Sequence, residues 1–252
     1  MLTKRIIPLF LLKEGRIYKG EKFKNFIDVG DPTSQGMIYD AQGADEIIIV
    51  DIEASKNKKV IDSRIITSMI TKCRLPIAAG GGIWDVRSAK KCFSAGADKI
   101  VVNTHAVLNP RLIKEMAREF GSQSVVVSID VKNNGSNYDV YIYSGIRKIG
   151  IKLEDLIKKL IDSGAGEIIV TCIDREGTMS GFDCNLYSRL RKLVSVPLIA
   201  SGGAGSYDHM VELFKESDCD ACAIGKMIFL RDYDIVRIKS YLKGKDITVR
   251  EA

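Results

Sequence analysis

Two glycine clusters and two aspartates are the residues of this chain whose types and spacing could support chemistry. The clusters lie in AAGGGI (78–83) and ASGGAG (200–205), each directly after an apolar run. Glycine lets backbone N–H groups come close to a phosphate. Asp51 and Asp130 end two other apolar runs, where a carboxylate can act as a general acid or base, or instead cap the following loop. The pattern predicts a site for a phosphorylated ligand beside a carboxylate.

An internal repeat shows how these residues are positioned. GADEIIIVDIEAS, from Gly43, reappears as GAGEIIVTCIDREGT from Gly164, and LPIAAGGGI, from Leu75, reappears as VPLIASGGAG from Val196. Both pairs are 121 positions apart. Repeated elements in the same order indicate a duplication. We therefore expect two equivalent halves, roughly residues 1–122 and 123–252.

Short β-rich runs alternate with helical patterns throughout both halves. The runs are almost continuously apolar, which is typical of parallel strands buried on both faces. Eight strand and helix units in 252 residues predict one (β/α)8 TIM barrel spanning residues 1–252, built from two duplicated half-barrels. The glycine clusters, with VVNT (101–104) and AIGK (223–226), then form two phosphate cradles on opposite sides of one barrel mouth. Here the mouth means the C-terminal ends of the barrel strands.

Composition narrows the classes of function. The net charge of +6 fits anionic metabolites or an acidic partner, whereas 7% aromatic residues and no Lys/Arg-rich block argue against nucleic acid. No apolar run approaches the ~20 residues of a membrane span, so we expect a cytoplasmic protein without membrane contact. Six scattered cysteines and two histidines predict reduced thiols, with no metal and no cofactor; a buried strand explains the C-x-x-C spacing of Cys219 and Cys222 better than zinc does.

The opposite, N-terminal ends of four strands each begin with a charge. These residues are Arg5, Glu46, Lys99 and Glu167, two basic and two acidic. One interpretation is that they are solvated strand starts. The other is a charged ring that closes the bottom of the barrel.

Many short motifs together carry a resemblance to a known family. They are KRIIP, KEGRIYKG, GDP (30–32), GADE, DIEAS, GGGI, GADKIVVNTHAV, FGSQSVVVSID, GAGEI, DREGT, GFD and IASGGAG. Over essentially its whole length the chain resembles the cyclase subunit of imidazole-glycerol-phosphate synthase (HisF). The resemblance implies that a glutaminase (HisH-like) subunit docks at the bottom and that ammonia passes through the core to a ligand with two phosphates. It also implies that Arg5, Glu46, Lys99 and Glu167 form the ammonia gate.

The resemblance further implies a set of phosphate- and substrate-binding residues at the mouth. They are Lys19, Asp51, Gly81, Gly82, Asn103, Thr104, Thr171, Glu176, Gly177, Ser201, Gly202, Gly203 and Gly225.

One catalytic position departs from the family pattern. The family has aspartates at the ends of its first and fifth barrel strands; here Asp130 is retained, but the first position is Leu11. The repeat indicates the same loss, because IIPLFL and VVVSID are equivalent strand ends. Removing a positioned general acid or base costs about 10²- to 10⁴-fold in rate. The resemblance therefore leaves open whether the barrel itself is an enzyme.

Three hypotheses about function follow from the resemblance. The leading one is a HisF paralogue of surface-polysaccharide biosynthesis, whose first strand also ends Leu-Leu-Lys; it passes ammonia from its glutaminase to a separate sugar amidotransferase that converts an N-acetyl group to an acetamidino group. The second is a genuine cyclase of histidine biosynthesis, in which Asp130 suffices or Glu53 substitutes. The third is a non-catalytic activator of the glutaminase that binds a phosphorylated ligand.

Overall fold

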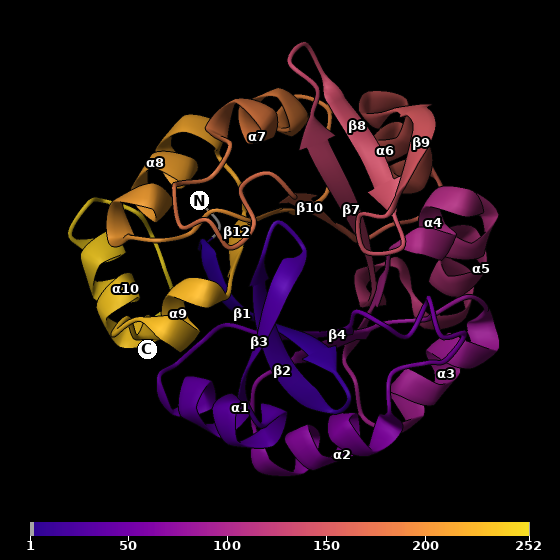
Figure 1. Ribbon diagram of the computed structural model, residues 1–252, viewed down its shortest axis with the longest axis horizontal. Coiled ribbons are helices and arrows are strands. Elements are labelled where there is room, and N and C mark those ends of the chain that lie inside the picture. The colour runs from indigo at the N-terminus through magenta and orange to yellow at the C-terminus, as the bar shows by residue number, and fades with distance from the viewer. Residues whose placement is uncertain (1–2, 252) are drawn as a thin grey trace.

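Eight parallel strands close into a barrel with helices around the outside (Figure 1). The structure is a computed structural model that describes residues 3–251. The barrel strands are β1 (Arg5–Lys13), β4 (Ile47–Asp51), β5 (Ile77–Gly80), β6 (Lys99–Val102), β7 (Val125–Asn133), β10 (Glu167–Cys172), β11 (Leu198–Ser201) and β12 (Ala221–Ile224). Parallel pairing of β12 with β1, and of β7 with β10, closes the ring. The predicted (β/α)8 fold is thus confirmed.

The helices follow the strands and cover the outer face of the barrel. They are α1 (Pro32–Ala41), α2 (Ser63–Lys72), α3 (Val86–Ser94), α4 (Thr104–Leu108), α5 (Pro110–Phe120), α6 (Leu153–Asp162), α7 (Cys184–Arg191), α8 (Tyr207–Ser217), α9 (Lys226–Leu230) and α10 (Ile235–Lys243). Local chemistry sets their ends: in α3 the Asp85 carboxylate accepts from the Ser88 amide in a capping box. Across residues 3–251, none of these helices has both the length and the apolar character needed to cross a bilayer.

Each half of the chain carries an antiparallel hairpin at the mouth. β2 (Arg16–Glu21) and β3 (Lys24–Gly30) extend β1, while β8 (Tyr138–Ile142) and β9 (Arg147–Lys152) extend β7. The Asn/Gly-rich stretch after Asp130 forms the turn of the β7–β8 hairpin. Its Asn134 carboxamide oxygen accepts from the Ser136 and Asn137 amides, which fixes the turn locally.

Side-chain alternation places one apolar cluster inside the barrel and a larger one between strands and helices. The inner cluster contains Ile7, Ile48, Ala78, Val101, Val126, Ile169, Ile199, Ala221 and Ala223, with Leu9 and Val50 packed against it. Both faces of each strand are therefore buried, which explains the near-continuous apolar runs. The barrel axis is lined by hydrocarbon from just above the bottom to just below the mouth.

Tyr187 of α7 ties two barrel strands together and offers a test of the fold. Its buried hydroxyl lies 3.0 Å from the Val170 carbonyl and 2.8 Å from the Ser201 carbonyl, and accepts from the Ser201 amide at 3.1 Å. Because Tyr187→Phe leaves these buried groups unpaired, we expect the free energy of unfolding to fall by about 1–3 kcal/mol in a urea titration. Tyr241→Phe is the matched control, since that hydroxyl contacts Asp208 at the exposed surface. Equal losses in the two variants would contradict this assignment.

Candidate functional site

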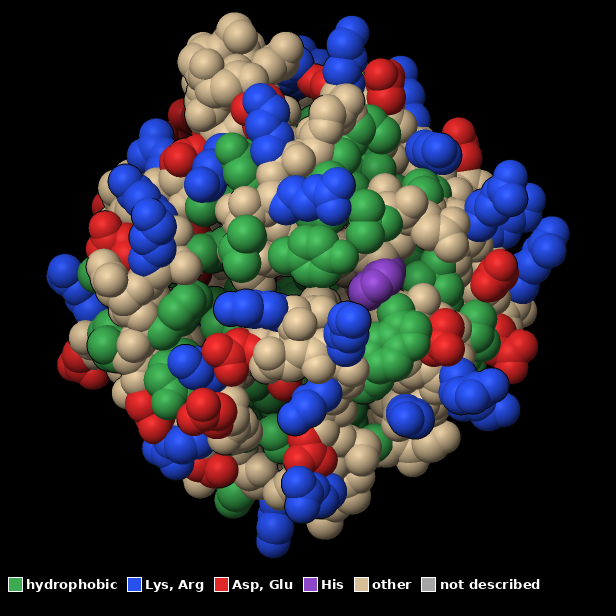
Figure 2. Space-filling model, turned by 45° about the vertical axis from the view of Figure 1, so that its right-hand side comes forward, with side chains coloured by type: hydrophobic (Ala, Val, Ile, Leu, Met, Phe, Trp, Pro, Cys, Tyr) green, Lys and Arg blue, Asp and Glu red, His purple; other side chains and the backbone are tan. Residues whose placement is uncertain are grey.

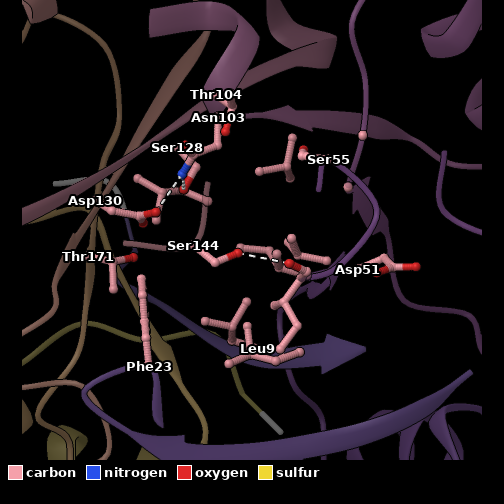
Figure 3. Close-up of a pocket in the computed structure, with 18 of the residues that line it drawn as sticks. Leu9, Phe23, Asp51, Ser55, Asn103, Thr104, Ser128, Asp130, Ser144 and Thr171 are labelled. Carbon is pink, nitrogen blue, oxygen red and sulfur yellow. Dashed lines mark hydrogen bonds between the residues drawn. The ribbon is translucent and has the colours of Figure 1, made fainter. Parts of the chain in front are cut away.

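A cavity at the barrel mouth brings together residues from most of the barrel strands (Figure 3). Of the residues predicted from sequence, it is lined by Leu11, Asp51, Gly81, Gly82, Asn103, Thr104, Asp130, Thr171 and Glu176. The remaining predicted residues lie outside its lining: Lys19, Gly177, Ser201, Gly202, Gly203 and Gly225. Their functional roles stay predictions.

Asp130, like Glu176, is a buried carboxylate of this cavity. It points inward from β7, and the Asn103 carboxamide donates to its Oδ2 at 3.0 Å. Burial raises the pKa of Asp130 to about 7, and nearby Glu176 acts in the same direction, whereas the bond from Asn103 opposes the rise. A carboxyl group that titrates near neutral pH can either accept or donate a proton.

Leu11 occupies the corresponding inward position of β1. With Leu9 and Phe23 it adds hydrocarbon to the cavity wall, and only 9% of its surface is exposed. Leucine has no proton to exchange and no hydrogen bond to offer. The mouth therefore has a carboxylate at the end of β7 and an apolar side chain at the matching end of β1.

The sequence left open whether Asp51 acts as a general acid or base or caps the following loop. Its Oδ1 accepts from the Glu53 amide at 2.9 Å and from the Ala54 amide at 3.0 Å. In Figure 3 its carboxylate is turned away from Asp130. The capping alternative thus accounts for the contacts of Asp51.

Lys19 of β2 is fully enclosed beside β1. Its ammonium donates to the Leu9 carbonyl and lies 5.1 Å from the centre of the Phe229 ring. Burial lowers the pKa of Lys19 to about 8, and Glu176 opposes that fall. A Cβ at Gly225 would collide with this ammonium, so glycine at 225 makes room for it.

The two glycine clusters lie on opposite sides of the ring, after β5 and after β11. Gly82 (φ +64°) and Gly203 (φ +111°) have backbone conformations that favour glycine, and a Cβ on either would overlap a neighbouring backbone carbonyl. These glycines are required by close packing of the loops whether or not a phosphate binds. Phosphate binding there remains a prediction.

Several residues of the cavity wall were not singled out as site residues from the sequence. They are Phe23, Phe26, Ser55, His105, Ser128 and Ser144. Phe23 and Phe26 reach the cavity only because the β2–β3 hairpin folds over the mouth. Ser144 is brought there by the β8–β9 turn, where its hydroxyl donates to the Ile52 carbonyl at 2.8 Å.

The four charged residues at the bottom meet in one cluster, which we call the charged ring. Arg5 donates to Glu46 at 2.9 Å and to Glu167 at 3.1 and 3.2 Å, and Lys99 lies 2.9 Å from both glutamates. Burial raises the pKa of Glu46, and the two cations oppose that rise. Burial alone would lower the pKa of Arg5, but Glu167 and Glu46 outweigh it and the pKa is raised. The four side chains are thus a linked network rather than separate solvated strand starts.

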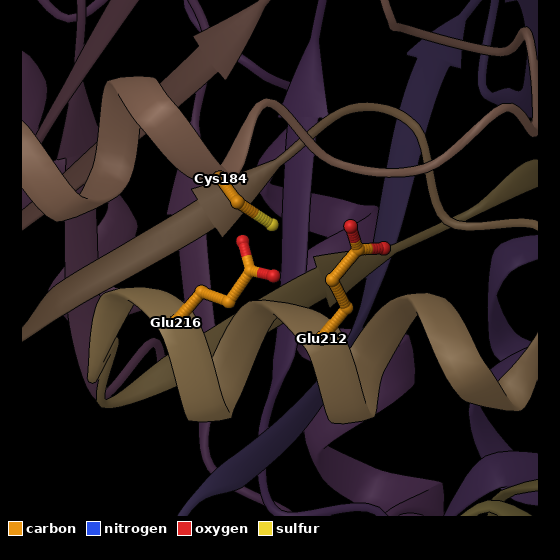
Figure 4. Close-up of side chains that lie close together, drawn as sticks. All are labelled: Cys184, Glu212 and Glu216. Carbon is orange, nitrogen blue, oxygen red and sulfur yellow. The ribbon is translucent and has the colours of Figure 1, made fainter.

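A group of potential metal ligands lies on the outer helices α7 and α8 (Figure 4). The ligand atoms of Cys184, Glu212 and Glu216 fall within 4.8 Å of one another, and both glutamates are exposed. Burial raises the pKa of the Cys184 thiol to about 12, and the two carboxylates add to the rise. Cys219 and Cys222 are buried free thiols, as are the other cysteines.

The fold and the mouth together define a class: a (β/α)8-barrel protein with glycine loops on both sides of the mouth and two buried carboxylates, Asp130 and Glu176, in the cavity between them. A family model described as "Histidine biosynthesis protein" matches residues 5–234. The chain is 41% identical to imidazole glycerol phosphate synthase subunit HisF of Methanococcus vannielii, over 99% of this chain and 100% of the relative. It is 41% and 40% identical to the HisF subunits of Bacillus pumilus and Bacillus subtilis, with the same coverage. The chain belongs to the HisF family of histidine biosynthesis proteins.

The raised pKa of Asp130 predicts a pH-dependent effect on stability. The folded state holds the Asp130 proton up to about pH 7, whereas the unfolded chain releases it near pH 3.8, so stability falls as pH rises between these values. Asp130→Asn removes this loss. The free energy of unfolding of the variant minus that of the wild type should be about 2 kcal/mol larger at pH 8 than at pH 5. Urea unfolding at the two pH values measures this difference.

Asp162→Asn, at the exposed end of α6, is the matched control and should show no such difference between the two pH values. An Asp130→Asn variant whose stability relative to the wild type is the same at both pH values would rule out the buried, protonated carboxyl.

Proposed function

We propose that this chain accepts ammonia from a glutaminase docked at the bottom of the barrel and conducts it to the mouth for amidination of an N-acetyl sugar. The observation that carries the proposal is the contrast between the two ends. The charged ring is complete and fully linked, whereas the mouth has Leu11 opposite its remaining carboxylate, Asp130. The end suited to receiving ammonia is intact, and the end suited to two-carboxylate chemistry is not.

The interior suits neutral ammonia rather than ammonium. Between the charged ring and the mouth, the inner cluster offers only hydrocarbon from residues such as Ile7, Ile48 and Ile169. An unpaired cation is strongly disfavoured in such surroundings, whereas a small uncharged molecule is not. Glutamine hydrolysis at the bottom would supply that neutral form without release into water.

The acceptor side of the proposal rests on Leu11 and on the family resemblance. With a carboxylate at only one of the two opposed strand ends, β1 and β7, the mouth is poorly equipped for ring closure, and ammonia would pass to a separate sugar amidotransferase. There the ammonia nitrogen replaces the carbonyl oxygen of the N-acetyl group, which leaves as water with two of the ammonia hydrogens, to give an acetamidino group. The word "subunit" in the names of the relatives supports a partner chain, since it describes them as parts of a larger synthase, and the family resemblance makes that partner a glutaminase.

A cyclase of histidine biosynthesis is the second candidate, and the comparisons favour it. Every relative named above is an imidazole glycerol phosphate synthase subunit. Asp130, with a pKa of about 7, is suited to acid–base chemistry on its own. The phosphoribulosyl intermediate and ammonia would then give imidazole glycerol phosphate and the aminoimidazole carboxamide ribotide.

Cyclisation of the histidine-pathway intermediate separates the two candidates. Ammonium salt replaces the glutaminase, so the assay reports on the mouth alone. We expect turnover by the wild type to be about 10²- to 10⁴-fold below that of Bacillus subtilis HisF, because Leu11 supplies no acid or base. The Leu11→Asp variant should recover part of that loss, and Leu11→Asn, which is polar but has no proton to exchange, should not. A wild type as fast as the Bacillus subtilis subunit would establish the cyclase instead.

The charged ring predicts a specific defect in coupling. Lys99→Ala leaves Glu46 and Glu167 with Arg5 as their only cation in the ring. In the complex with glutaminase and sugar amidotransferase, we expect the acetamidino product formed per glutamine hydrolysed to fall about tenfold, equivalent to about 1.4 kcal/mol. Product formed from ammonium salt should not change.

Lys243→Ala is the matched control, because the Lys243–Glu251 pair is exposed and outside the barrel. Removal of all four ring charges without any effect on coupling would disprove the role of the ring in ammonia transfer.

A further inference from the structure

A groove on the rim of the barrel continues outward from the mouth cavity. Its wall is formed by Ser55, Lys56, Lys58, Trp84, His105 and Tyr143. Two of these residues, Ser55 and His105, also line the mouth cavity, so the two spaces share a wall. Figure 2 brings forward the side of the molecule on which α3 and α4 lie, and there hydrophobic side chains border a histidine among several Lys and Arg side chains.

The groove is built from four separate segments that are held in place. Lys56 and Lys58 come from the loop after β4, Trp84 precedes α3, His105 lies in α4 and Tyr143 is in the β8–β9 turn. The Tyr143 amide donates to the Thr104 hydroxyl at 3.1 Å, and the Trp84 amide donates to the Ser88 hydroxyl at 3.1 Å. The groove wall is thus fixed to the elements that also form the mouth.

The chemistry of the wall combines free positive charge with flat aromatic surface. Lys56 and Lys58 are exposed, and within residues 3–251 neither has an ion-pair partner. None of the groove residues is acidic, and the nearby Glu53 is held by Lys13 at 3.5 Å. Trp84, the only tryptophan of the chain, has 40% of its surface exposed although it is a large apolar side chain.

We propose that this groove binds a nucleoside diphosphate, with the base stacked on Trp84 and the diphosphate facing Lys56 and Lys58. Bases stack on aromatic side chains whatever their sequence, and unpaired lysines attract phosphate. Because the groove opens into the mouth cavity, a group attached to the second phosphate reaches toward Asp130. This deepens and rests on the proposed function, since it makes the N-acetyl sugar a nucleotide-linked one, which the groove would hold beside the mouth for the separate sugar amidotransferase.

Titration of the full chain with uridine diphosphate and adenosine diphosphate tests the groove, with Trp84 emission as the signal. We expect saturable quenching below about 1 mM ligand. Uridine or inorganic pyrophosphate alone should bind at least about tenfold more weakly, because each supplies only one of the two contacts. The Lys56→Gln/Lys58→Gln double variant should weaken nucleotide binding about tenfold.

The Lys90→Gln/Lys91→Gln double variant is the matched control, since it removes two exposed lysines of α3 that do not line the groove. Calorimetry measures binding in the variants that lack the tryptophan signal. Trp84→Phe should retain nucleotide affinity, and Trp84→Ala should lose about tenfold or more of it. Three results would each overturn the proposal. They are the absence of saturable binding, binding of pyrophosphate as tight as that of the nucleotide, and equal weakening of binding in the two double lysine variants. Such a result would leave ammonia delivery untouched, because that is measured separately as product formed per glutamine hydrolysed.

Discussion

Closure of the strands into a ring forces alternate side chains of every strand into the barrel, and the arrangement of both ends follows from that constraint. In β1, Arg5, Ile7, Leu9 and Leu11 all face inward, so one strand contributes to the charged ring, the hydrocarbon interior and the mouth. A slip of one residue would turn all four outward. Register therefore sets function here: the same pairing that buries Ile7 places Leu11 where a carboxylate could have been.

Buried charges are stabilised differently at the bottom and at the mouth of the barrel. At the bottom, Arg5 and Lys99 compensate Glu46 and Glu167, although such networks offset their desolvation only when their geometry is good. At the mouth, Asp130 has no cation among its hydrogen-bond partners, and its burial favours the protonated form. The Asn103 carboxamide donates a hydrogen bond to this carboxyl group. The buried carboxylates at the bottom are thus paired with cations, whereas the mouth changes charge near neutrality.

Sequence patterns predicted the parallel barrel, the charges at the bottom and the carboxylate of Asp130 at the mouth. These features depend on the strand period and on the repeat. The apolar runs around Ile48 and Ile169, and the charges at Glu46 and Glu167, are each visible in single segments. The cavity wall was not predictable in this way. Phe23 reaches the mouth through a turn in which Lys22 and Phe23 both have positive φ, a conformation that neither residue type signals. The burial of Lys19 likewise depends on Gly225, which is more than 200 positions away and makes room for the ammonium.

Leu11 changes the acid–base behaviour of the mouth in more than one way. Two facing carboxylates raise one pKa through mutual repulsion and share a proton. Here the pKa of Asp130 reaches about 7 chiefly through burial, and the hydrocarbon of Leu9 and Leu11 contributes to that apolar enclosure. Asp130 is therefore poised between its two protonation states without a carboxylate facing it from β1, and Glu176 is the other buried carboxyl group of the cavity. What the mouth lacks is a proton carrier at the end of β1, so a reaction that needs proton donation and removal from these two strand ends at once is impaired more than one that needs a single proton transfer.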